Sequence, residues 1–207
     1  MKRSLAAEMN LLQRLHVALH DLVRRNRIKV KAGNVLECGY KERLKMRKVD
    51  LHIKGKGNRM VVGKDTMIAC CKVRVCGQNQ TLVIGERCEY HAGKIYLRYN
   101  RNQKIVIGNE ASIEDCYLLT DEDASITIGD GVLMSKLVHF RAGDGHSVMD
   151  VATGKRINRS RDIVVGDHVW IGRGATLLKG AHVADNSIVG AYAVVTRRYE
   201  QIGVAIA

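Results

Sequence analysis

The chain has 207 residues, of which 46% are hydrophobic and only 4% aromatic, with 20 glycines and no proline. This length suits one domain with a substantial core, and the composition is typical of a soluble globular protein. Residues 1–60 hold 16 of the 34 Lys and Arg against only 5 of the 21 Asp and Glu, so most of the net charge of +13 lies there. The nearly neutral remainder argues against a nucleic-acid groove through the main domain.

The sequence predicts neither a transmembrane helix nor a signal peptide. No apolar run approaches the roughly 18 residues that a transmembrane helix needs. The opening MKRSLAAEMNLLQRL is interrupted too early by Glu8, Asn10 and Gln13 to read as a signal peptide. We therefore expect a cytoplasmic protein.

The first predicted element is an amphipathic helix over residues 4–25, with Ser4 as a candidate N-cap. Its apolar stripe consists of Leu5, Met9, Leu12, Leu15, Leu19 and Leu22. Basic residues follow it, so the helix could lie on an anionic membrane, on a partner helix or on its own domain. The pattern favours packing, because most amphipathic helices bury their stripe.

The second half of the chain repeats with a period of six. Aliphatic residues recur at every sixth position, and small residues stand four positions after most of them. The aliphatic series is Val165, Ile171, Leu177, Val183, Val189 and Val195. A period of six fits a chain that turns a corner every six residues and directs one aliphatic side chain into a narrow prism. Three sides close one coil, and stacked coils pair their backbones.

A looser repeat precedes this one. Gly63, Gly85, Gly108 and Gly129 follow the pairs VV, VI, VI and TI at intervals of 22, 23 and 21 residues. We expect about six to seven coils from this spacing. The expected organisation is a basic helical segment over residues 1–49 and a β-helical domain over 50–207, with a protruding polar loop over 147–161.

The segments GDGHS, IVVGDHVWIGRGATLLKG and NSIVGAYAVVT together resemble hexapeptide-repeat acyltransferases. The similarity covers roughly residues 55–205 and is greatest to bacterial capsule and lipopolysaccharide O-acetyltransferases, with maltose and galactoside O-acetyltransferases as relatives. It implies a mainly β fold, a left-handed parallel β-helix, assembled as a homotrimer with shared active sites. It also implies transfer of an acetyl group from acetyl-CoA to a sugar or polysaccharide hydroxyl.

The resemblance implies that His146, in GDGHS, is the general base. It stands 24 residues before Trp170, as the family arrangement leads one to expect. A sugar hydroxyl is a poor nucleophile until its proton is removed, and imidazole accepts a proton near neutral pH. A polar loop histidine without a catalytic role is the alternative.

The resemblance also places Arg173, Ala191, Thr196 and Arg197 at CoA-binding positions, with Arg198 as a nearby alternative. Arginine suits phosphate because its donors form a fixed fork, although both arginines could form a solvated corner. Relatives continue with a GNPA(K/R) tail that helps to bind CoA, whereas the printed chain ends at GVAIA.

On the acceptor side the implied residues are Asp115, Asp123 and Trp170. Either aspartate could instead cap a turn, and Trp170 could fill a contact between subunits. The eight histidines show no spacing for a zinc site, so no metal is expected. The alternative function is a non-catalytic β-helical scaffold in a polysaccharide assembly complex.

Overall fold

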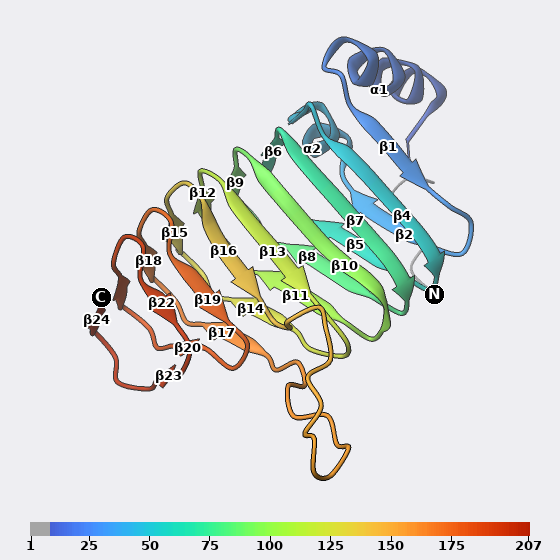
Figure 1. Cartoon of the computed structure of the whole chain (residues 1–207). Helices are drawn as coiled ribbons and strands as arrows, with labels where there is room; N and C mark the ends of the chain where they lie inside the picture. Colours follow the sequence, from blue (N-terminus) through green and yellow to red (C-terminus); the bar gives the residue numbers. More distant parts are fainter. Residues whose placement is uncertain (1–8) are drawn as a thin grey trace.

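The computed structural model describes residues 9–207 and is a three-sided parallel solenoid (Figure 1). Each coil contributes one strand to each of three eight-stranded sheets, and successive coils pair in parallel. The first sheet contains β1 (Arg27–Val30), β4 (Asp50–Lys56), β7 (Cys71–Gln78), β10 (Gly93–Arg101), β13 (Cys116–Thr120), β16 (Val138–Arg141), β19 (Thr176–Leu178) and β22 (Val194–Val195).

The other two sheets follow the same order along the solenoid. The second contains β2 (Val35–Cys38), β5 (Arg59–Val62), β8 (Thr81–Ile84), β11 (Lys104–Ile107), β14 (Ile126–Ile128), β17 (Ile163–Val165), β20 (His182–Val183) and β23 (Arg198–Tyr199). The third contains β3 (Met46–Arg47), β6 (Met67–Ala69), β9 (Glu89–Tyr90), β12 (Ser112–Ile113), β15 (Leu133–Met134), β18 (Trp170–Ile171), β21 (Ile188–Val189) and β24 (Ala205–Ile206).

The six-residue period has the structural meaning expected of it. Val165, Ile171 and Leu177 lie on three successive sides of the prism and are at most 1% exposed. Their equivalents in the next coil, Val183, Val189 and Val195, are fully buried beside them. Like side chains therefore stack along the axis and exclude water over the whole length of the core. The expected mainly β, parallel solenoid with an N-terminal helix is confirmed.

The solenoid begins earlier than the repeat indicates. Strands β1, β2 and β3 form a first coil, and Arg27 is paired in register with Asp50 of the next coil. Residues 27–47, expected within the basic helical segment 1–49, thus contribute strands, and the eight coils exceed the six to seven expected. In the first coil Gly39 follows β2 as Gly63 follows β5, but the corner after it holds the short helix α2 (Tyr40–Leu44).

The N-terminal helix α1 (Leu11–Val23) is shorter than the predicted 4–25. It begins at a capping box in which Asn10 and Gln13 each accept a hydrogen bond from the other's backbone N–H. Ser4 and Leu5, expected at its start, lie outside the described residues.

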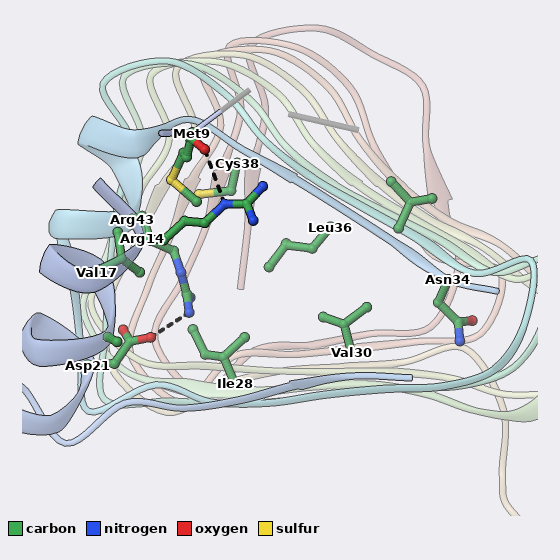
Figure 2. A pocket seen from close by; sticks show the side chains of 12 residues that line it. Met9, Arg14, Val17, Asp21, Ile28, Val30, Asn34, Leu36, Cys38 and Arg43 are labelled. Carbon is green, nitrogen blue, oxygen red and sulfur yellow. Dashed lines mark hydrogen bonds and ion pairs between the residues drawn. The ribbon is translucent and has the colours of Figure 1, made fainter. Parts of the chain in front are cut away.

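The predicted leucine stripe of α1 does not face the domain. Leu12, Leu15, Leu19 and Leu22 are each at least 60% exposed, whereas Val17 on the opposite side is buried. The ion pair of Asp21 with Arg43 and the hydrogen bond between His16 and the hydroxyl of Tyr40 hold the helix against the first coil. Figure 2 shows the pocket between α1 and the first coil, which lies at the open end of the core. Its volume is about 440 Å³.

One long segment leaves the solenoid. Between β16 of the first sheet and β17 of the second, residues 142–162 extend outward (orange in Figure 1). Elsewhere in the described coils the same corner is crossed by a short turn, such as residues 121–125 between β13 and β14. This excursion contains His146.

Candidate functional site

His146 lies at the root of the protruding loop, and its side chain is exposed. Asn158 lies in the part of the loop that returns to the solenoid. Its Nδ2 donates a hydrogen bond to the main-chain carbonyl oxygen of His146 at 2.7 Å. The same amide nitrogen donates to Asp144 at 2.8 Å, and Oδ1 of Asn158 accepts the backbone N–H of Val148 at 2.7 Å. Asn158 is only 9% exposed, so one buried amide holds the backbone at His146 and Val148 and the carboxylate of Asp144.

Two ion pairs connect this loop to the coils. Asp144 pairs with Lys179, which follows β19 in the next coil, and this hydrogen bond lowers the pKa of the Asp144 carboxyl below its ordinary value. Glu122, in the preceding coil, pairs with Arg156 and also accepts the backbone N–H of Ser160 at 2.8 Å. The loop that carries His146 is therefore held from the coils before and after it.

Trp170 is placed elsewhere. It lies on β18 of the third sheet and is 53% exposed, whereas the loop of His146 joins the first and second sheets. In register with Trp170 are Leu133 on β15 and Ile188 on β21, which are 52% and 43% exposed. The structure thus does not bring His146 and Trp170 together within one chain. Instead, Trp170 is the centre of an apolar row on the outside of the third sheet.

The two candidate acceptor residues lie at opposite ends of β13. Asp123 is exposed in the turn after the strand, at the corner from which the His146 loop leaves in the next coil. Asp115 precedes the strand, at the far corner, and lines a hollow with Tyr117 and His139. Only Asp123 shares the corner of His146.

The candidate CoA residues flank the edge strand β22. Arg173 and Ala191 lie at one corner in successive coils, where the carbonyl of Arg173 accepts the backbone N–H of Tyr192 at 2.7 Å. Thr196 and Arg197 follow β22 at the next corner, and all four residues are exposed. Gly172 permits the close stacking at the first corner, because a Cβ there would lie 2.7 Å from the backbone nitrogen of Ala191.

Arg197 and Arg198 differ in their surroundings. Arg198 donates to Glu200 at 2.6 Å and lies 3.0 Å from Nδ1 of His182. Its hydrogen bond lowers the pKa of Glu200. The guanidinium of Arg197 lies over the ring of Tyr199, 5.0 Å from its centroid, which leaves its outer face available to an anion.

Sequence reasoning missed the residues that hold the loop, chiefly Glu122, Asn158 and Lys179. Glu122 is 34 and 38 residues from Arg156 and Ser160, and Lys179 is 35 residues from Asp144, so these separations follow no short motif. Asn158 is 12 residues from His146, within the loop itself. The one available signal was the loop itself, since a segment as long as residues 142–162 needs polar anchors where it leaves a solenoid. No cluster of three or more His, Cys, Asp or Glu suited to a metal ion occurs within residues 9–207.

Comparison with known proteins agrees with this architecture. A family model described as bacterial transferase hexapeptide, with six repeats, matches residues 162–197. A polysialic acid O-acetyltransferase of Escherichia coli O1:K1 / APEC is 32% identical over 80 residues, covering 39% of this chain and 26% of that protein. A polysialic acid O-acetyltransferase of Neisseria meningitidis is 27% identical over 130 residues, covering 63% of this chain and 60% of that protein.

The matched segments thus span less than two thirds of these relatives' own length. A crystal structure of the polysialic acid O-acetyltransferase OatWY superimposes with a TM-score of 0.70 at 23% identity, over 87% of this chain and 81% of that one. The likeness in structure shows a shared fold. Together these matches confirm the resemblance to hexapeptide-repeat acetyltransferases. Over the described part of the chain, no helix has the length and apolarity required to cross a bilayer.

Proposed function

We propose that the protein is an acetyl-CoA-dependent O-acetyltransferase that acts on a hydroxyl of a sugar or polysaccharide. The observation that carries the proposal is the anchored loop, in which a buried amide fixes an exposed histidine where residues 142–162 leave the hexapeptide solenoid. The similarity of the chain to two polysialic acid O-acetyltransferases supports O-acetyl transfer as the reaction.

In this proposal His146 acts as the general base. Its imidazole accepts the proton of the acceptor hydroxyl while the oxygen attacks the acetyl carbonyl of the thioester. A new C–O bond forms, the C–S bond breaks, and the thiolate of CoA leaves and takes up a proton. No acyl-enzyme forms. Asn158 keeps the backbone of His146 in place during this transfer, and Asp123 offers a carboxylate at the same corner to orient the acceptor.

The residues that flank β22 fit an anionic donor. Arg173 and Arg197 are exposed, and no carboxylate pairs with either among the described ion pairs. Charge-assisted hydrogen bonds from guanidinium to phosphate are strong, and the narrow corner at Gly172 and Ala191 allows a ligand to approach the backbone. Thr196 contributes a hydroxyl beside Arg197.

We also propose that the site is formed by more than one copy of the chain, in a homotrimer. Trp170 and His146 lie on different sides of one prism, so a shared site needs Trp170 from a neighbour. The apolar row of Leu133, Trp170 and Ile188 is suited to such a contact, because exposed apolar patches rimmed by polar residues mark interfaces.

The test is transfer of radiolabelled acetyl from acetyl-CoA to a panel of neutral and carboxylated oligosaccharides, with products identified by mass. Transfer by the wild type and its loss in His146→Ala support the proposal. The alternative is a non-catalytic scaffold, which predicts no acetyl-CoA binding in a calorimetric titration and no labelled product with any acceptor.

A further inference from the structure

The outer surface of the first sheet is unusually basic over β4, β7 and β10. Parallel pairing places Asp50, Lys72 and Lys94 in one row and Lys54, Cys76 and Arg98 in another. Arg74 lies between these rows, beside His52 and Tyr96. Lys54, Lys72, Lys94 and Arg98 are exposed, because alternate residues of each strand point away from the core. We refer to Lys54, Lys72, Arg74, Lys94 and Arg98 as the basic face.

Little negative charge compensates these groups. Among them, only Arg74 forms an ion pair with a carboxylate of the described residues, that of Asp50, which starts β4. The other four cations take part in none of the ion pairs found within residues 9–207. Like charges this close repel one another. A bound anion relieves this repulsion and so lowers the free energy of the face.

Aromatic side chains continue the face toward the next coils. Tyr96, Tyr117 and His139 form a ladder in which successive ring centroids are 5.6 Å apart and the rings meet edge to face. Arg98 lies over the ring of Tyr96, 4.6 Å from its centroid. The ladder makes a semi-rigid floor beside the flexible lysines.

The surface is hollowed along this line. One hollow of about 310 Å³ is lined by four residues of the basic face, Lys54, Lys72, Arg74 and Arg98, together with His52, Cys76 and Tyr96. A second, of about 660 Å³, is lined by Lys94, Tyr96, Arg98, Tyr117 and His139, with Asp115 at its end. The two share Tyr96 and Arg98, and together they cross five coils, or roughly 20 Å at about 4.8 Å per strand.

We propose that the basic face and its aromatic floor bind an acidic polysaccharide, one whose sugar units carry carboxylates. This deepens the proposed function and rests on it for the link to catalysis, although binding itself needs no catalysis. A shallow groove with cations in rows at the spacing of the coils suits a flexible chain that carries one negative charge on each repeating unit.

A single-stranded nucleic acid fits the face less well. Such ligands depend on bases stacking on open aromatic faces. Here Tyr96 is only 8% exposed and is covered by Arg98, and the other rings meet edge to face. Carboxylates need only the guanidinium and ammonium groups, which are open to solvent.

The position of the face explains what binding would do. Strand β16 carries His139 at the end of the aromatic ladder and continues through Arg141 into the loop of His146. A polymer held on the first sheet is thereby kept close to the proposed base. The local concentration of its hydroxyls rises, so long acceptors should react at lower concentration than short ones.

The test uses the double variant Lys72→Gln/Lys94→Gln, which removes two exposed charges without changing side-chain length greatly. Lys64→Gln/Lys104→Gln is the matched control, because it removes two exposed lysines from outside the first sheet. Binding of polysialic acid chains of defined length is measured by calorimetry without acetyl-CoA. Neutral dextran and an oligothymidylate serve as comparison ligands.

We expect the basic-face variant to weaken polysialic acid binding at least fivefold, the control to leave it within twofold, and dextran not to bind. Unchanged binding in the basic-face variant, equal loss in the control, or tighter binding of oligothymidylate overturns the inference. Acetyl transfer to a short acceptor is assayed separately. Transfer without polymer binding refutes this inference alone, whereas polymer binding without any transfer refutes the proposed function alone.

Discussion

The side-chain amide of Asn158 donates a 2.7 Å hydrogen bond to the main-chain carbonyl of His146, twelve residues before it in the loop. Because Asn158 is nearly buried while His146 is exposed, the anchor and the reactive group are separate residues. One can be removed without the other, which makes their roles separable by experiment.

Replacing His146 by alanine should abolish the base and leave the solenoid intact, since this side chain lies outside the core. We expect kcat to fall by roughly 10²- to 10⁴-fold with an unchanged circular dichroism spectrum and Tm. Steady-state release of CoA is the measurement. Turnover within a few-fold of wild type would exclude His146 as the base.

Asn158→Ala should lower kcat by about 10-fold or more, because the loop around His146 loses two hydrogen bonds to its backbone and one to the Asp144 carboxylate. Asn158→Asp keeps the acceptor for Val148 but loses the donor to His146 and places a second carboxylate beside Asp144. We therefore expect it to be no better than alanine. A KM effect with normal kcat, or full activity of the aspartate variant, would contradict a positioning role.

Arg197→Ala should weaken acetyl-CoA binding by about one to two orders of magnitude, since a charge-assisted hydrogen bond contributes about 1.5–3 kcal/mol. Arg198→Ala should have the smaller effect, because Arg198 is already engaged with Glu200 and His182. Calorimetric titration with acetyl-CoA and with dephospho-CoA measures both. Equal affinities of wild type and Arg197→Ala would remove Arg197 from the donor site.

The anchor at Asp144 should respond to acid. Lys179 lowers the folded-state pKa of Asp144. The ion pair therefore stabilises the fold fully above the ordinary Asp pKa of about 3.9, and this stabilisation is lost as pH falls through the lower folded-state pKa. Hydrogen exchange at the Val148 amide should therefore stay slow, after correction for intrinsic rates, from pH 7 to 5 and accelerate below about 4. Lys179→Gln should weaken this acid dependence, because the ion pair is lost while the hydrogen bond from Asn158 to Asp144 remains. Faster exchange already between pH 7 and 5 in the wild type would point to another group.

The exposed apolar face of α1 predicts a contact outside the single chain. Leu15→Glu/Leu19→Glu should leave Tm unchanged, because both side chains are at least 60% exposed. If α1 lies on an anionic membrane, as its basic flank at Arg24 and Arg25 suggests, the variant should lose co-sedimentation with phosphatidylserine vesicles. A drop in molecular mass by light scattering, with vesicle binding absent in wild type, would assign the face to contacts between copies instead.

Much of the architecture was already present in local sequence. Each side of the prism takes six residues, so the hexads from Val165 to Val195 determine both the strands and the inward-facing residues. The loop of His146 was visible as a break in that period, and the family resemblance supplied its proposed role. The physical reason is that every coil repeats the same short-range pattern of burial.

Only the tertiary structure decided the rest, because turns of unequal length shift the register between coils. Pairing with the second coil, as at Arg27 and Asp50, identifies the first coil, and the face that α1 presents depends on how Val17 packs. Asn158 meets His146, and Lys72 meets Lys94, through contacts that no local spacing encodes. Sequence periodicity determines which side chains are inside, whereas the register of stacked coils determines which outer side chains become neighbours.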